Sequence, residues 1–145
     1  VAYRAANTLD AMVGHRCARY ERFGWAAARL DDLLTWPAAR VGAALAVGLA
    51  PLAGGRAPEA WRVLRADGGG HPSPNAGRME AAFAGALGVR LGGLNSYDGR
   101  VERRPRLGDG RHPGPADIVA AVRLSALVGA AAALCAAVAA EAVGR

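Results

Sequence analysis

Lysine is absent from this sequence of 145 residues, and all 18 basic residues are arginine. There are 12 acidic residues, so the formal net charge is +6. Aromatic residues make up only 6% and are not interleaved with the arginines, whereas proteins that bind single-stranded nucleic acids stack bases on aromatic side chains in a basic groove. We attribute the arginine excess to genomic base composition, because alanine and glycine are abundant as well, and we expect no nucleic-acid partner.

Recognisable metal and nucleotide motifs are lacking too. The two cysteines, Cys17 and Cys135, are isolated, one in a polar segment and the other in an apolar run. This spacing excludes a cysteine-based metal motif and argues against a disulfide. No Walker A sequence is present, so no standard motif predicts nucleotide binding. Any chemistry has to rest on other polar residues.

Long apolar runs are few, and two segments come near to the length that a bilayer requires. The first, residues 38–53, has a continuously apolar part of twelve residues, 41–52, which is short for a hydrocarbon core of about 30 Å. It is either a tilted, re-entrant or broken membrane segment or a buried soluble helix. The second, residues 118–143, has seventeen uncharged residues between Arg123 and Glu141. Its composition favours a transmembrane helix over an alanine-rich packing helix.

Charged and polar segments make up the rest of the chain. Apolar residues recur at helical spacing in residues 1–35, which predicts amphipathic helices broken near Gly14. Residues 54–117 are rich in glycine and proline and carry ten arginines against seven acids. Their last part, from 100 to 115, has no apolar period and is expected to be a loop. If both apolar segments span, the positive-inside rule places residues 54–117 in the cytoplasm.

The expected fold is therefore mainly α. It is a helical integral membrane protein, multi-pass in the cell membrane, with a long polar cytoplasmic loop at residues 54–117.

The densest group of polar side chains lies between residues 68 and 80. A glycine-rich loop precedes Ser73 and Pro74, which are typical of the N-cap and the first position of a helix. Gly88 is typical of a helix C-terminus. We therefore expect a helix over 74–87. Backbone N–H groups at a helix start and in a glycine loop bind anions. The alternative is a capped, close-packed helix with solvated charges at its mouth. The candidate substrate- or phosphate-binding residues are Gly69, Gly70, Ser73, Asn75, Arg78, Arg90 and Asn95.

Three blocks of the sequence resemble the CobD/CbiB family, the membrane-bound adenosylcobinamide-phosphate synthases of cobalamin biosynthesis. The blocks are NTLDAMVG (7–14), FGWAAARLDD (23–32) and HPSPNAGRMEAAFAGALGVRLGG (71–93). The resemblance places residues 1–145 as about the C-terminal half of a family member. Within the third block, Arg78 and Met79 stand where the family usually has an apolar residue and a proline.

The resemblance implies an ATP-dependent amide ligase. The family joins the carboxylate of adenosylcobyric acid to an amine to give adenosylcobinamide phosphate. Whether the amine donor is aminopropanol phosphate, its free alcohol or threonine phosphate stays open. The implied cofactors are ATP and Mg²⁺, and the implied partners are the corrinoid substrate, aminopropanol phosphate, the lipid bilayer and other cobalamin-assembly enzymes. The alternative is a non-enzymatic membrane scaffold or transporter component. A transporter should carry polar residues within its spans, and residues 118–143 have few.

Carboxylates and one histidine supply the candidates for this chemistry, since ATP-dependent activation requires carboxylates for Mg²⁺ and positive groups for phosphate. Adjacent Asp31 and Asp32 are candidate Mg²⁺ ligands. Side chains of neighbouring helical residues point about 100° apart, so the pair could bracket a metal only if the helix ends there, as Pro37 suggests. The alternative is a solvated pair in which Asp32 binds Arg29. The candidate catalytic residues are Glu80, Asp32 and His71, the last as a general base toward the amine.

Overall fold

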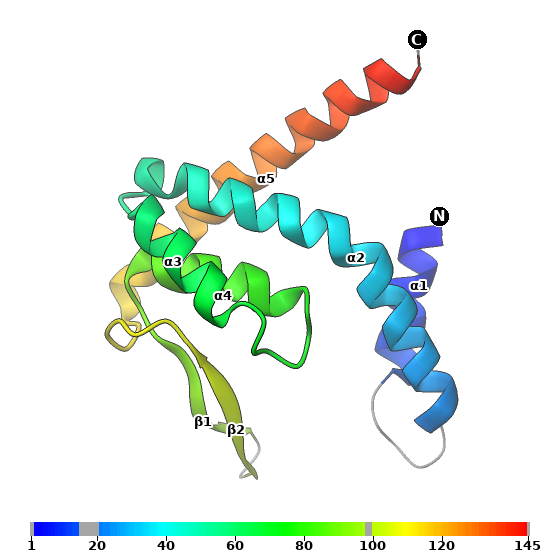
Figure 1. Cartoon of the computed structure of the whole chain (residues 1–145), viewed down its shortest axis with the longest axis horizontal. Coiled ribbons are helices and arrows are strands. Elements are labelled where there is room, and N and C mark those ends of the chain that lie inside the picture. Colours follow the sequence, from blue (N-terminus) through cyan, green and yellow to red (C-terminus); the bar gives the residue numbers. More distant parts are fainter. Residues whose placement is uncertain (1, 15–20, 98–99, 145) are drawn as a thin grey trace. The chain divides into compact units, whose positions relative to one another are not determined.

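The computed structural model describes residues 2–14, 21–97 and 100–144 and is mainly helical (Figure 1), which confirms that part of the expected fold. Its elements are α1 (Ala2–Val13), α2 (Glu21–Leu49), the 3₁₀ helix η1 (Ala50–Ala53), α3 (Ala57–Asp67), α4 (Ala76–Leu87), β1 (Leu91–Tyr97), β2 (Arg100–Leu107) and α5 (Pro115–Val143). The chain divides into two compact units, unit 1 (Val1–Ala38) and unit 2 (Ala39–Arg145).

Helix α2 is longer than the sequence suggested, because it continues through Pro37 to Leu49. The segment 38–53 is therefore the end of α2 followed by η1. Proline inside a helix removes one backbone hydrogen bond. Burial of the alanines that come after it, such as Ala43 and Ala46 at 1% and 0% exposure, offsets that loss. The expectation that a helix ends at the aspartate pair was wrong, since Asp31 and Asp32 lie inside α2.

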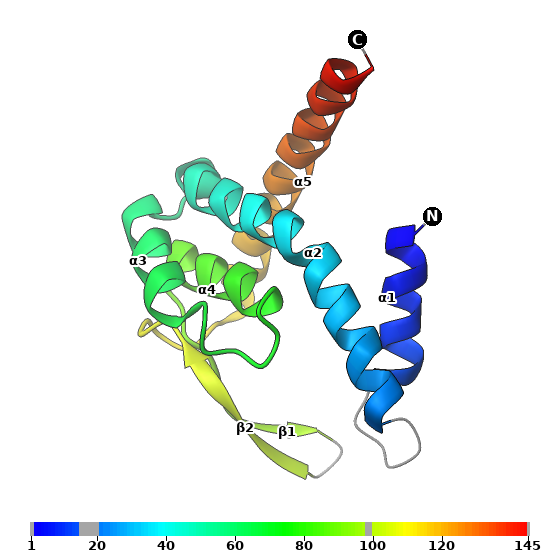
Figure 2. The same cartoon turned by 45° about the vertical axis from the view of Figure 1, so that its right-hand side comes forward.

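Helices α3 and α4 lie side by side in unit 2 (Figures 1 and 2). Small side chains bring them close: Ala60 of α3 and Ala82 of α4 are both 0% exposed and belong to one apolar core, to which α5 adds Leu124. At Gly85 the two backbones nearly touch. A Cβ atom there would lie 2.5 Å from the carbonyl oxygen of Glu59, a separation that only a shift of α3 could relieve.

We expect Gly85→Ala to destabilise the protein by about 1–3 kcal/mol, because the added methyl group overlaps the α3 backbone. Gly48→Ala is the matched control, since a Cβ on Gly48 in α2 meets nothing within 4 Å and alanine favours a helix by about 1 kcal/mol. Thermal unfolding of the purified protein should show a lower Tm for the first variant and an equal or higher Tm for the second. Equal Tm values would contradict the close approach of α3 and α4.

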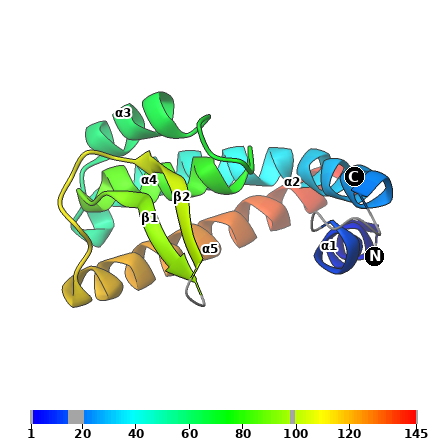
Figure 3. The ribbon, with the colours of Figure 1, turned by 90° about the horizontal axis from the view of Figure 1, so that it is seen from below.

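Strands β1 and β2 form an antiparallel hairpin (Figure 3) where the sequence predicted a loop. Leu91 pairs with Leu107 at the base of the hairpin. Leu107 is 1% exposed and packs with Val63 of α3 and Ala81 of α4. The expectation of a loop was wrong for residues 100–107, because backbone hydrogen bonds and the buried Leu107 hold strands that lack an apolar period. Residues 108–114 belong to no helix or strand.

Gly92 and Gly93 are part of β1 and mark an irregularity in its pairing with β2. Both have positive φ, 77° and 92°, and the register shifts between Leu91 and Gly93. A β-bulge of this kind commonly uses glycine. A side chain on Gly92 would also overlap the carbonyl oxygen of Pro105. The two glycines therefore let the strands meet at an irregular register.

Helix α5 buries few of its apolar side chains, and its C-terminal half extends beyond α3 and α4 (Figures 2 and 3). Two helical segments, Gly24–Ala53 and Pro115–Ala142, are long and apolar enough to cross a membrane by length and composition. Within the second segment, only 11% of the most apolar stretch of 18 residues is buried. The large apolar residues of α5 with exposures of 60–67% are Ile118, Val119, Val122, Leu134 and Val138.

Candidate functional site

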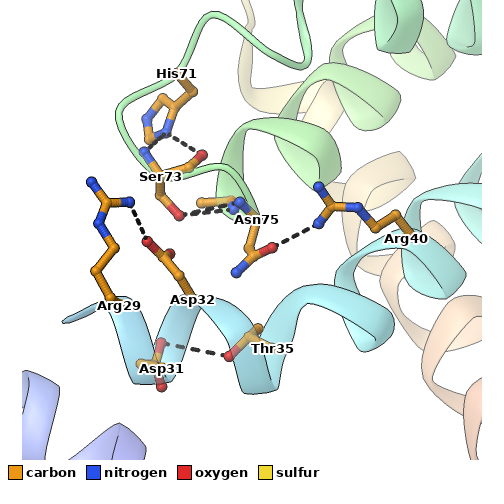
Figure 4. A network of polar contacts seen from close by, with 9 residues as sticks. Arg29, Asp31, Asp32, Thr35, Arg40, His71, Ser73 and Asn75 are labelled. Carbon is orange, nitrogen blue, oxygen red and sulfur yellow. Dashed lines mark hydrogen bonds and ion pairs between the residues drawn. The ribbon is translucent and has the colours of Figure 1, made fainter. Parts of the chain in front are cut away.

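The candidate site begins at Ser73, which the sequence placed at the N-cap of a helix from Pro74. In the structure α4 begins at Ala76 and its N-cap is Asn75, so that expectation was wrong by two residues. The Ser73 carbonyl accepts the Gly77 N–H at 3.2 Å. The Ser73 hydroxyl accepts the N–H groups of Asn75 at 3.4 Å and Ala76 at 3.2 Å (Figure 4). At the other end Gly88 stops α4 with φ of 62°, as the sequence predicted.

These caps correct the basis for the expected anion site. The N–H groups of Asn75, Ala76 and Gly77 already donate to Ser73, and the N–H of Gly70 donates to the Asp67 carbonyl at 2.9 Å. The sequence had suggested that such N–H groups bind a phosphate. A hydroxyl or a carbonyl inside the loop already accepts a hydrogen bond from each of these donors, so the candidates for anion binding here are side chains.

Asn75 occupies the centre of the site and is 5% exposed. Its Oδ1 accepts a hydrogen bond of 2.8 Å from Nη1 of Arg40 on α2 (Figure 4). Arg40 was not among the residues that the sequence pointed to. The signal that could have identified it is a lone charge directly before the apolar residues 41–52, since a charge at that position needs a polar partner.

Arg78 brings a second guanidinium group to the site. Burial, and after it the nearby guanidinium of Arg78, lower the pKa of Arg40 below its usual value, so two positive charges lie near each other. The Nε of Arg78 is buried and has no hydrogen-bond partner among the described residues. A buried donor without an acceptor is costly, and two repelling cations favour an anion between or beside them. The side chains of Arg40 and Arg78 thus have the charge and the donor to bind phosphate oxygen.

His71 and Glu80 form the second polar pair of the site. The His71 Nε2 lies 3.9 Å from a carboxylate oxygen of Glu80, and the two side chains are 10% and 44% exposed. The other ring nitrogen, Nδ1, accepts the Ser73 N–H at 3.1 Å (Figure 4). The site therefore combines a half-exposed carboxylate with a nearly buried imidazole.

Arg90 and Asn95 lie elsewhere. Arg90 comes after the C-terminal cap of α4, at the opposite end of the helix from Asn75, and its guanidinium contacts Nε2 of His112 at 2.6 Å. A helix of 12 residues is about 18 Å long. Asn95 lies further along, in β1, opposite Glu102. The structure does not gather these two residues with Ser73, Asn75 and Arg78.

Asp31 and Asp32 belong to unit 1, and each carboxylate has protein partners (Figure 4). Asp31 accepts from Asn7 Nδ2 at 3.2 Å and from the Thr35 hydroxyl at 3.5 Å. Asp32 forms an ion pair of 3.3 Å with Arg29, which is the pairing that the sequence offered as the alternative to metal binding. Carboxylate oxygens are the ligands that Mg²⁺ prefers, one or two of them together with substrate phosphates, so either carboxylate by itself suits Mg²⁺. Because both lie inside α2, their side chains diverge and the pair does not bracket one ion.

Metal ligation of other kinds has no support in the part of the chain that the structure describes. No group of three or more His, Cys, Asp or Glu side chains gathers there. Cys135 is exposed with a free thiol, and Cys17 lies outside the described residues.

Known proteins match most of the chain. A sequence model of the family described as CobD/Cbib protein matches residues 1–125. The cobalamin biosynthesis protein CobD of Mycobacterium tuberculosis is 56% identical over 134 residues, which cover 92% of this chain and 43% of that relative. The protein of the same name from Geobacter metallireducens is 51% identical over 113 residues, 78% of this chain and 36% of the relative. The chain thus spans less than half the length of these curated relatives. No solved structure matches it.

Proposed function

Because this chain belongs to the CobD/CbiB family of cobalamin biosynthesis, we propose that it forms part of an ATP-dependent amide ligase. The ligase attaches aminopropanol or its phosphate to the carboxylate of adenosylcobyric acid and yields adenosylcobinamide or its phosphate. The observation that carries this proposal is the cluster at the start of α4, where Arg40 and Arg78 supply positive charge and Glu80 supplies a half-exposed carboxylate.

Side chains bind the phosphate in this proposal. The buried Nε of Arg78 gains the acceptor that it lacks among the described residues, and the repulsion between Arg78 and Arg40 is relieved when an anion binds. Hydrogen bonds between guanidinium and phosphate are charge-assisted and about twice as strong as neutral ones. The phosphate belongs either to ATP or to a phosphorylated amine donor.

Glu80 acts on the amine in this proposal. An alkyl ammonium group cannot attack an activated carboxylate until it loses a proton, and a carboxylate within reach can accept that proton. Glu80 lies one turn after Gly77, on the exposed side of the cluster, with 44% of its side chain accessible. It is therefore positioned to meet a substrate that enters from solvent.

The implied Mg²⁺ is assigned to an aspartate of unit 1. Asp32 would supply a carboxylate oxygen to it, and the ion when bound neutralises phosphate charge during phosphoryl transfer. Because neighbouring side chains on α2 diverge, Asp32, whose side chain is 25% exposed, is the carboxylate that we assign to the metal.

The ligase proposal is tested in membranes from cells that lack the native gene, with and without the full-length protein that contains this chain. ATP-dependent formation of adenosylcobinamide phosphate from adenosylcobyric acid and aminopropanol phosphate is expected only when the protein is present. The free alcohol and threonine phosphate, tested in parallel, identify the amine donor. Absence of amide formation with all three amines would contradict the ligase and favour a non-enzymatic scaffold.

We further propose that α5 crosses the cell membrane and that the apolar end of α2 (residues 41–52) enters it as a re-entrant segment, with the arginine-rich residues 54–117 in the cytoplasm. The apolar and mostly exposed side chains of α5 support this, because such a surface is unfavourable in water. The full-length protein is expected to stay in the pellet when membranes are washed with alkaline carbonate and centrifuged. Recovery in the supernatant would contradict membrane insertion.

Asn75→Asp is expected to raise the KM for the phosphate-bearing substrate at least about tenfold, since a like charge beside a bound phosphate costs upward of about 1.4 kcal/mol. The variant keeps an oxygen for the Arg40 hydrogen bond, so the fold should persist. Asn75→Ala should raise KM as well, but it also leaves the Arg40 donor without this acceptor. Steady-state kinetics per mole of folded protein separate the two effects. An unchanged KM in Asn75→Asp would make Asn75 purely structural.

A further inference from the structure

The protonation of His71 is set by its neighbours. Nδ1 lies 3.1 Å from the backbone nitrogen of Ser73 and 3.3 Å from the Ser73 carbonyl oxygen. The backbone nitrogen always carries its proton and donates it toward Nδ1. A proton on Nδ1 would therefore face another proton. A neutral imidazole has one donor and one acceptor nitrogen, so Nδ1 is the acceptor and Nε2 carries the hydrogen.

Nε2 faces Glu80. The distance to the nearer carboxylate oxygen is 3.9 Å, longer than a hydrogen bond, and rotation of the half-exposed Glu80 side chain closes it. Catalytic hydrogen bonds are often long before substrate binds and shorten afterwards. In this tautomer His71 has no lone pair with which to accept a proton from a substrate, because its only acceptor atom, Nδ1, already accepts the Ser73 N–H.

A glycine holds the imidazole in this place. A Cβ on Gly77 would overlap the Cβ of His71 and lie 3.2 Å from the carbonyl oxygen of Gly68, so the loop packs directly against the first turn of α4. Residues three apart on a helix share a face, which puts Glu80 beside the side chain that covers Gly77. The arrangement leaves the ring little freedom, as its 10% exposure indicates.

We propose that His71 is a positioning residue for Glu80: its Nε2–H donates to the carboxylate and fixes it toward the amine, and His71 is not itself the general base. This inference rests on the role proposed for Glu80 and replaces the general-base role that the sequence suggested for His71. A histidine that orients a reacting carboxylate acts as outer-shell partners do, and loss of such a contact typically costs roughly 10- to 100-fold in activity.

Two substitutions separate the positioning role from a structural one in the full-length protein. His71→Asn places an amide near Nδ1 and keeps an acceptor for the Ser73 N–H, but it cannot reach Glu80. His71→Gln reaches as far as Nε2 and can donate to Glu80, but it loses the Nδ1 contact. We expect His71→Asn to fold normally and lose kcat roughly 10- to 100-fold, and His71→Gln to keep kcat within a few-fold of wild type. In a Glu80→Gln background His71→Asn should cause no further loss.

Three outcomes would overturn the proposal. Full activity of His71→Asn would make the Ser73 contact the only role of His71. Loss of activity in both folded variants would favour His71 as the general base. A ¹⁵N spectrum of histidine-labelled full-length protein that shows the proton on Nδ1 would contradict the tautomer. This spectrum needs no turnover, so it tests the His71 geometry even if the ligase assay fails, and failure of that assay alone counts against the proposed function.

Discussion

Glu80→Gln is expected to lower kcat for amide formation by roughly 100- to 10,000-fold, the range that a positioned general base contributes. The KM for the amine donor should stay within a few-fold, because glutamine keeps the shape of the side chain and removes only its charge and basicity. The fold should be unaffected, since Glu80 is half-exposed and its one described ion-pair contact is the 3.9 Å approach to His71. Steady-state kinetics of the full-length protein, together with a thermal melt, measure all three quantities.

Glu59→Gln is the control for this prediction. Glu59 is a helical glutamate of similar exposure, 35%, and binds Arg62 at 2.8 Å on α3. Surface ion pairs of this kind contribute little to stability. Its kcat should match that of the unmodified protein. If Glu80→Gln stays as active as Glu59→Gln, Glu80 takes no part in the reaction, and the start of α4 is only a capped, close-packed helix.

Asp32→Asn is expected to abolish ligation, because an amide oxygen is a far weaker ligand for Mg²⁺ than a carboxylate. The protein should remain folded and inserted, since the exposed ion pair with Arg29 stabilises it little. Any residual activity should require a higher Mg²⁺ concentration. A magnesium titration of the ligation rate in the full-length protein gives this readout.

Arg29→Gln distinguishes the metal from the ion pair. It breaks the same 3.3 Å contact but leaves the Asp32 carboxylate in place, so its activity should be near normal and its magnesium requirement unchanged. If Asp32→Asn is nearly as active as Arg29→Gln, the aspartate serves the ion pair alone and the Mg²⁺ assignment fails.

The helical elements could be read from the sequence where local signals were strong. Gly88 ends α4 as expected because a left-handed glycine acts within a few residues, and Ser73 lies just before its N-cap, Asn75. The uncharged run of residues 124–140 similarly indicated α5. Helix α3 and the hairpin were missed because they lie in a segment rich in glycine, proline and arginine. The α3–α4 contact and the burial of Leu107 stabilise them, and both join parts of the chain that are distant in sequence.

The candidate site divides in the same way. His71, Ser73, Asn75, Arg78 and Glu80 are near one another in sequence, so any turn that leads into a helix gathers them. Arg90 and Asn95 were expected to join them and do not, because α4 separates its two ends. Arg40 joins Asn75 across 35 positions, and no local pattern encodes such a pairing.

The sequence by itself determined the family, the mainly helical fold, the glycine stop of α4 and most of the polar residues near its start, because each depends on residue types over short spacings or on long matching blocks. Only the tertiary structure decided two other features: α2 continues through Pro37, and Arg40 donates a hydrogen bond to Asn75. The physical reason is that burial and long-range hydrogen-bond pairing are properties of groups that meet in space. A proline that would end an isolated helix is tolerated where packing stabilises the helical turns after it, and a charged side chain finds its partner only when the chain folds.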